Sequence, residues 1–80
     1  MHEDQINERV GTRLLTRRRA LGLTQRAVAD AVGVRFQQIQ KYECGASRVS
    51  PVRLLALSKA LNVSIDYFFE GLVRQRQAAE

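Results

Sequence analysis

The sequence predicts an all-α fold, a compact bundle of five short helices, and three observations support this prediction. Apolar residues recur every three or four positions, which is the period of one face of an α-helix. Glycines and short polar residues that favour helix ends separate these stretches. No run alternates polar and apolar residues, so we expect no β-sheet.

Each expected helix has boundary signals of its own. Gly22 ends the first helix, and Thr24 is placed to cap the second. The pair Ser50 and Pro51 is typical of a helix start, and Ser64 begins the last helix. The five helices are expected over residues 6–21, 25–32, 36–43, 51–61 and 65–72.

The two ends of the chain have weaker signals. Either Asp4 or Asn7 is placed to cap the first helix. Residues 1–5 and 74–80 are expected to fray. We therefore expect one domain over residues 1–80 with a core at 9–71, because 80 residues leave no room for a second domain.

Composition excludes several classes of protein. A single Cys cannot form an internal disulfide, which fits a reducing cytoplasm, and one Cys with one His cannot form a zinc finger. No stretch approaches the roughly 18 consecutive apolar residues of a membrane span. The chain has no Gly-rich phosphate loop and no Ser, His and Asp set. We expect no enzyme, metal, cofactor, small-molecule ligand or membrane partner.

Positive charge is concentrated in the middle of the chain. The net charge is +5, and 11 of the 13 basic residues are Arg. Residues 9–53 contain ten basic and two acidic residues, whereas residues 1–8 have a net charge of −3 and residues 54–80 a net charge of zero. This distribution is typical of a nucleic-acid-binding protein. The alternative is a solvated basic surface.

The second and third expected helices have the pattern of a helix-turn-helix, at about residues 24–44. Only the segment Val32, Gly33 and Val34 connects them, so they must cross steeply. Gly33 allows positive φ in the turn, and Ala29 is small where the helices approach each other.

The third expected helix has a polar outer face that suits base recognition. With Ile39 turned inward, Gln37 and Lys41 project outward one turn apart, and Gln38 and Gln40 flank them. Gln pairs with adenine and Lys reaches the acceptors of guanine in the major groove. The alternative is an ordinary polar helix face.

These residues resemble the Cro/cI-type (xenobiotic-response-element, XRE) helix-turn-helix regulators of phage and bacteria over roughly residues 9–71. The match covers several short motifs: Leu21-Gly22-Leu23-Thr24-Gln25, Val28-Ala29, Val32-Gly33-Val34, Ile39, Tyr42-Glu43, Gly45, Leu57, Ala60-Leu61, Val63-Ser64 and Asp66-Tyr67-Phe68-Phe69. The resemblance implies a lambda-repressor-like DNA-binding domain of five helices that binds operator DNA as a homodimer.

The resemblance also implies roles for individual residues. Gln25 is expected to contact a phosphate, and Arg18 is expected to form a buried pair with Glu43. Arg18 lies within about 60° of Leu14 on the helix, which supports the pair independently, although a phosphate contact is the alternative for this Arg. The expected base-reading positions are Arg35, Phe36, Gln37, Gln38 and Lys41.

Two positions depart from the family pattern. Phe36 stands where a polar residue is common, and it either packs inward or contacts a thymine methyl group. Arg35 replaces the usual Ser or Thr cap and gives up a bond worth about 1 kcal/mol. That loss is reasonable if Arg35 meets a phosphate or base, and simple tolerance is the alternative.

Further phosphate contacts are expected from Ser47, Arg48, Arg53 and Arg13, whereas Arg17 is expected to be solvated. The predicted function is a sequence-specific, double-stranded DNA-binding transcriptional repressor on a pseudo-palindromic operator. Its homodimer is expected to form through the fifth helix and the apolar residues Leu72 and Val73, although the apolar residues of that helix also suit the core. The alternatives are an antitoxin-type interaction module and a restriction–modification controller.

Overall fold

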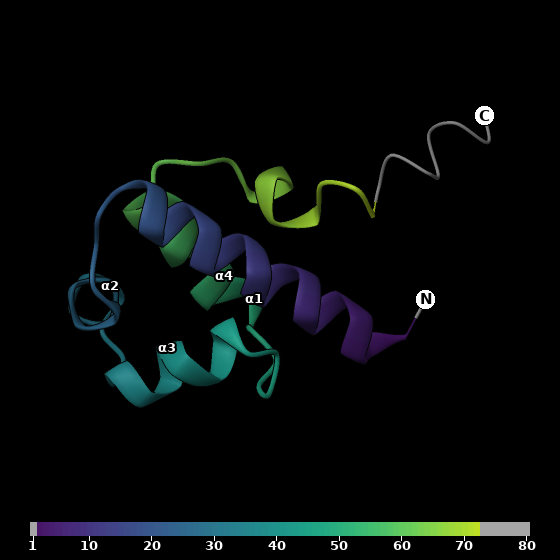
Figure 1. Cartoon of the computed structure of the whole chain (residues 1–80), viewed down its shortest axis with the longest axis horizontal. Coiled ribbons are helices and arrows are strands. Elements are labelled where there is room, and N and C mark those ends of the chain that lie inside the picture. Colours follow the sequence, from purple (N-terminus) through teal and green to yellow (C-terminus); the bar gives the residue numbers. More distant parts are fainter. Residues whose placement is uncertain (1, 73–80) are drawn as a thin grey trace.

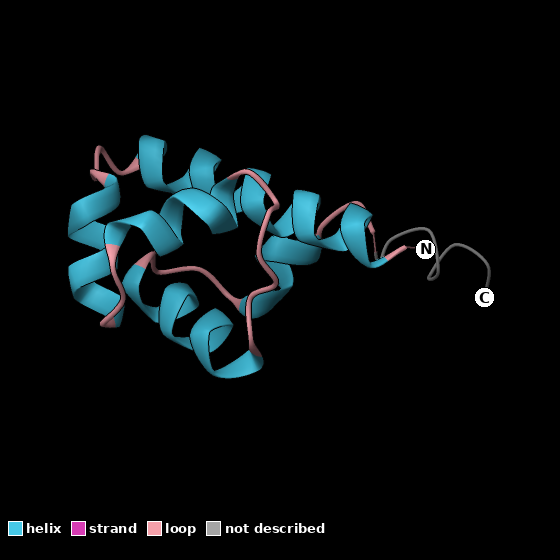
Figure 2. Ribbon diagram, turned by 90° about the horizontal axis from the view of Figure 1, so that it is seen from below, coloured by secondary structure: helices cyan, strands magenta, loops and turns pink. Residues whose placement is uncertain are grey.

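The computed structural model describes residues 2–72, and within this range it contains α-helices, one 3₁₀ helix and no strand. The elements are α1 (Glu3–Ala20), α2 (Gln25–Val32), α3 (Phe36–Glu43), α4 (Pro51–Ala60) and η1 (Ile65–Phe69). Helix α1 runs along the molecule, with α3 on one side of it and η1 on the other (Figure 1). Short loops join the helices (Figure 2).

The expected start and stop signals act at α2 and α4. The Thr24 hydroxyl accepts a hydrogen bond from the Ala27 amide at 3.0 Å, and the Ser50 hydroxyl accepts one from the Arg53 amide at 3.2 Å. Pro51 occupies the first turn of α4. Gly33 ends α2 with φ +76°, a left-handed conformation that glycine adopts without strain.

The prediction of a fifth α-helix is wrong. The segment Ile65–Phe69 is a 3₁₀ helix of five residues, and the described chain therefore has four α-helices. An α-helix would use the Tyr67 carbonyl to accept from Gly71, but this carbonyl accepts from the Glu70 amide at 3.5 Å and from Arg13 Nε at 3.0 Å. Contact with α1 thus favours the tighter turn.

The apolar residues of this segment are buried to different extents. Phe68 is fully buried, and Phe69 and Leu72 are half-buried, but Ile65 is exposed. The short 3₁₀ turn therefore contributes mainly one aromatic side chain to the core. Val73 and residues 74–80 lie outside the described residues.

Residues 3–5, which were expected to fray, belong to α1 in the structure. The cap is neither Asp4 nor Asn7 but His2, whose backbone amide donates to Gln5 Oε1 at 3.1 Å. Glu3 and Asp4 lie in the first turn, where negative side chains stabilise the positive end of the helix dipole.

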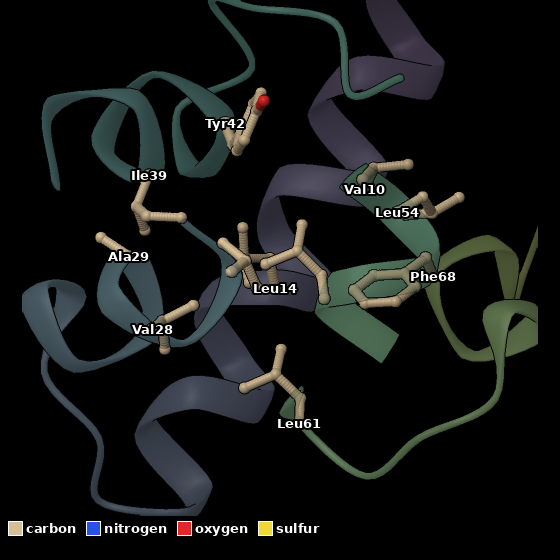
Figure 3. Close-up of a cluster of buried hydrophobic side chains, with 11 residues drawn as sticks. Val10, Leu14, Val28, Ala29, Ile39, Tyr42, Leu54, Leu61 and Phe68 are labelled. Carbon is tan, nitrogen blue, oxygen red and sulfur yellow. The ribbon is translucent and has the colours of Figure 1, made fainter. Parts of the chain in front are cut away.

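All five elements contribute to one core, with Leu14 of α1 near its centre (Figure 3). The buried apolar residues are Val10, Leu14, Val28, Ala29, Val32, Ile39, Tyr42, Leu54, Leu57, Leu61 and Phe68. Ile39 and Tyr42 bury one face of α3, so the opposite face of this helix is left for solvent or a partner.

Gly11 lets α1 approach the end of α3 closely, a role that the sequence analysis did not assign. A Cβ at this position would lie 2.2 Å from the carbonyl oxygen of Tyr42 and 2.8 Å from that of Glu43. Real Cβ atoms do not approach backbone this closely, so the position requires glycine. An isolated Gly inside a helical pattern was the available signal.

Across residues 2–72, none of the helices combines the length and apolar character needed to traverse a lipid bilayer. The same residues contain no cluster of three His, Cys, Asp or Glu side chains placed to hold a metal ion.

Candidate nucleic-acid interface

Helices α2 and α3 are held in a tight pair by the turn at Gly33. The amides of Gly33 and Val34 both donate to the Ala29 carbonyl, at 2.8 and 3.0 Å. Ala29 is buried at this approach, as its small size suggests. Figure 3 shows Ala29 of α2 and Ile39 of α3 between the two helices. The packing fixes the orientation of α3 relative to the rest of the molecule.

The outward face of α3 is polar and unengaged. Gln37, Gln40 and Lys41 are exposed, and Gln38 is half-exposed. Within the described range, the side chains of these four residues form no hydrogen bond or ion pair with the rest of the protein. The face therefore presents amide and ammonium groups that a partner can use without displacing an internal contact. That these groups read DNA bases stays a prediction.

Two open hollows meet at Gln37. One, of about 610 Å³, also includes Arg35, Lys41 and Arg53 in its lining. The other, of about 430 Å³, is also lined by Gln37 and Arg35, together with Arg26 of α2. Cationic side chains thus stand on both sides of the outward glutamine.

The start of α3 carries the two unusual residues of the sequence. Arg35 is the N-cap and is exposed, and its side chain makes no capping hydrogen bond. Phe36 is half-buried and packs against the core, and the Arg26 guanidinium carbon lies 4.1 Å from the centre of its ring. Phe36 therefore packs inward on one side and supports a cation on the other.

A buried ion pair joins α1 to the end of α3. Arg18 Nε donates to Glu43 Oε2 at 2.5 Å and Arg18 Nη2 donates to Glu43 Oε1 at 3.0 Å, and the two side chains are only 11% and 6% exposed. Hydrogen bonding to Glu43 raises the pKa of Arg18, and this effect outweighs the lowering by burial. Arg18 therefore stays charged and acts as a structural bridge.

Two further contacts extend this pair. Arg18 Nη1 donates to the Leu23 carbonyl at 2.9 Å, and Gln25 Nε2 donates to Glu43 Oε1 at 2.9 Å. The cluster thus links α1, α2 and α3. The Gln25 amide already forms a hydrogen bond inside the protein. Its expected phosphate contact stays a prediction, and that contact requires Gln25 to share or give up its bond to Glu43.

The other expected phosphate contacts lie in different places. Arg53 lines the first hollow and donates through Nη1 to the Val32 carbonyl at 2.9 Å. Ser47 and Arg48 lie in the loop after α3, and Arg48 Nε lies 2.7 Å from an oxygen of Glu3 in an exposed ion pair. The structure thus places these cations around α3 but gives each of the two arginines a protein partner.

Arg13 is not grouped with them. Its Nη2 pairs with Glu70 at 2.5 Å, and its guanidinium carbon lies 3.8 Å from the centre of the Tyr67 ring. The Tyr67 hydroxyl in turn donates to the Arg13 carbonyl at 3.1 Å. Arg13 therefore fastens η1 to α1.

The helix-turn-helix family matches residues 14–68, more than half of the chain. The chain belongs to this helix-turn-helix family. Among its relatives, a transcriptional regulator in the ATPase CF(0) region of Rhodospirillum rubrum is 52% identical over 69 residues, which cover 86% of this chain and 64% of that protein. Repressor protein C2 of Salmonella phage P22 is 37% identical over 70 residues, which cover 88% of this chain and 32% of the repressor.

Solved helix-turn-helix structures share the fold. The restriction–modification controller protein C.AhdI of Aeromonas hydrophila has a TM-score of 0.76 and 32% identity, with 79% of this chain and 96% of that chain covered. The clp gene regulator ClgR of Corynebacterium glutamicum has a TM-score of 0.79 and 28% identity, with 92% and 80% covered. By contrast, this chain spans 64% of the Rhodospirillum rubrum protein and 47% of a regulator from Sinorhizobium medicae.

Arg17 shows where the helix-turn-helix pattern gave no guidance. It was expected in solvent, but it is half-buried and its Nε donates to the Leu61 carbonyl at 2.9 Å. Leu61 caps the end of α4, where carbonyls lack partners within the helix. Only the packing of α1 against this end reveals the role of Arg17.

Proposed function

We propose that this chain is a sequence-specific double-stranded DNA-binding transcriptional regulator, acting as a repressor and not as an enzyme. The observation that carries the proposal is the outward face of α3, where the exposed Gln37 lines two hollows that contain cationic side chains and the exposed Lys41 lines one of them. An α-helix fits the major groove of B-DNA, and side-chain amides and ammonium groups match the edges of its bases. Because its target is genomic DNA, we place the regulator in the cytoplasm.

In the proposed mechanism, α1 and α4 form the scaffold that holds α3 in the major groove. Arg35, Arg53 and Arg48 set its register on phosphates, and Gln37 and Lys41 read base edges. Such phosphate contacts make affinity strongly dependent on salt, with losses of roughly 10³–10⁵-fold between 50 and 200 mM for about 6–10 contacts.

We further propose that the regulator acts as a homodimer on a pseudo-palindromic operator. The surface around η1 is the proposed dimer contact, because it lies across α1 from α3 and leaves the reading face open (Figure 1). Two copies would then meet half-sites about one helical turn apart. Sedimentation at tens of micromolar checks this, and a monomer there would count against a preformed dimer.

Selection of bound sites from a random duplex library tests the proposed function. We expect an enriched motif with two-fold symmetry and half-sites separated by about one turn. Failure to enrich any motif, with binding that does not depend on salt, would refute DNA recognition.

A restriction–modification controller is the second candidate. C.AhdI, which bears that description, is similar in sequence and fold over 96% of its length. A methyltransferase gene beside the gene for this chain, with the selected motif in their shared promoter, would favour this role over regulation of unrelated genes.

A further inference from the structure

Arg26 and Phe36 form a contact that the proposed function does not yet use. Arg26 lies in the first turn of α2 and is exposed, and its guanidinium carbon lies 4.1 Å from the centre of the Phe36 ring. A guanidinium over an aromatic face is held by its attraction to the ring's negative face. Since the ring itself packs against the core, it offers Arg26 a fixed platform.

The ring competes with a nearby carboxylate. Asp30 lies four residues after Arg26 on α2, the spacing at which opposite charges pair on a helix surface. Across residues 2–72 there is no ion pair between Arg26 and Asp30, although both line the same hollow. The guanidinium rests on Phe36 instead.

The position of this contact matters for DNA. The hollow beside Arg26 also contains Arg35 and Gln37, and its two Arg outnumber the single Asp30. On the other side of Gln37, the first hollow contains Lys41 and Arg53. The base-reading position therefore has cations on both sides, as the major groove, about 12 Å wide, has a phosphate strand on both sides.

We propose that Arg26 binds a backbone phosphate of the DNA and that Phe36 is the residue that positions it. A guanidinium whose face rests on a ring still has its N–H groups free at the edge, where they donate to phosphate oxygens. The inference rests on the proposed function and adds a second residue of α2, beside Gln25, to its contact surface. It also gives the aromatic residue at position 36 a role other than contact with a thymine methyl group.

The test uses a mixed-sequence 20-base-pair duplex and fluorescence anisotropy between 50 and 200 mM salt. Loss of one phosphate contact in Arg26→Ala should lower the slope of log affinity against log salt by about 0.9, and should weaken binding about eight-fold at 0.1 M. Lys59→Ala is the matched control, because it removes one exposed positive charge that lies outside both hollows. It should leave the slope nearly unchanged.

Variants at Phe36 separate its role in positioning Arg26 from its packing against the core. Phe36→Tyr keeps the ring and should bind like the wild type, whereas Phe36→Leu should lose as much affinity and slope as Arg26→Ala, with thermal unfolding confirming that each variant folds. Adding Asp30→Asn should restore more affinity in the Phe36→Leu background than it adds to the wild type. That difference measures competition for Arg26.

The outcomes distinguish failure of the proposed DNA-binding function from failure of the role given to Arg26 and Phe36. If the wild type shows no salt-dependent binding to duplex DNA, the proposed function and this inference both fail. If the wild type binds but Arg26→Ala behaves like Lys59→Ala, only the inference fails. A Phe36→Leu variant that keeps the wild-type slope, or that alters preference at a single base pair, would also overturn the positioning role.

Discussion

The inner side of α1 and the outer side of α3 both carry polar, hydrogen-bonding residues, but they use them differently. Arg13, Arg17 and Arg18 each donate through Nε to another part of the protein. On α3, Gln37 and Lys41 are exposed and have no such contact within residues 2–72. The polar and basic side chains of this chain therefore form two groups. One group stabilises the fold, and the other is available to a partner.

The α1 arginines have this role because helices end near them. Leu61 caps α4, and Leu23 follows the end of α1, so both are positions where carbonyls need donors from outside the helix. A guanidinium offers five N–H groups on a long side chain and suits this task. The net charge of +8 in residues 9–53 thus overstates the number of cations free to meet phosphate.

Arg18→Ala should show the largest effect, because it removes the buried ion pair between α1 and α3. It leaves Glu43 buried with only Gln25 as a hydrogen-bonding side chain, and should lower the free energy of unfolding by about 3–5 kcal/mol. Arg19→Ala, at the next position and exposed, should stay within about 0.5 kcal/mol of the wild type. Equal urea-unfolding curves for the two variants would contradict the structural role of Arg18.

Gly11→Ala should be the next most severe change, because it forces α1 away from the end of α3. The new Cβ meets two backbone carbonyls, and we expect a loss of about 1–3 kcal/mol in unfolding free energy despite the better helix propensity of Ala. Thr12→Ala, at an exposed neighbour on the same helix, is the control. A stabilised Gly11→Ala protein in thermal unfolding would show that the close approach is not required.

Gln37→Ala tests whether the outer side of α3 reads DNA bases. It should cost about 1–3 kcal/mol of discrimination at one base pair of the selected site and leave unfolding unchanged, since the side chain makes no internal contact. Competition binding with single-base variants of the site measures this. Equal losses on the selected site and on unrelated DNA would break the base-reading assignment.

Arg48→Ala should have the smallest effect and affect all DNA sequences alike. Arg48 must leave its exposed pair with Glu3 to meet a phosphate, and such pairs are worth about 0.2–1 kcal/mol, which reduces its net contribution. Binding to selected and random duplexes, titrated side by side, should weaken by the same factor. A change in base preference would instead assign Arg48 to the reading surface.

Local signals explain the parts of the fold that the sequence predicted well. Thr24, Gly33 and Ser50 act within a few residues of their own position, and the boundaries of α2 and the start of α4 lie where these residues place them. The inward turn of Ile39 followed from helix periodicity alone, and it exposes Gln37.

The features that the sequence missed depend on contacts between distant segments. The 3₁₀ form of η1 follows from a bond between Arg13 and the Tyr67 carbonyl, 54 residues apart. Gly11 becomes necessary only because the end of α3 crosses α1 at that point. The platform of Arg26 on Phe36 likewise requires the crossing of α2 and α3, which no residue pattern along one helix reveals.

The central claim is that the arginines of α1 stabilise the fold while the outer side of α3 contacts DNA. Its most direct test is a two-dimensional ¹⁵N NMR titration of the chain with its selected duplex. Bonded Nε–H groups exchange slowly, so Arg13, Arg17 and Arg18 should each give a side-chain signal in the free protein. We predict that these signals stay in place while the side-chain amide signals of Gln37 shift as DNA is added. Large shifts of the three arginine signals with an unchanged Gln37 would contradict the account.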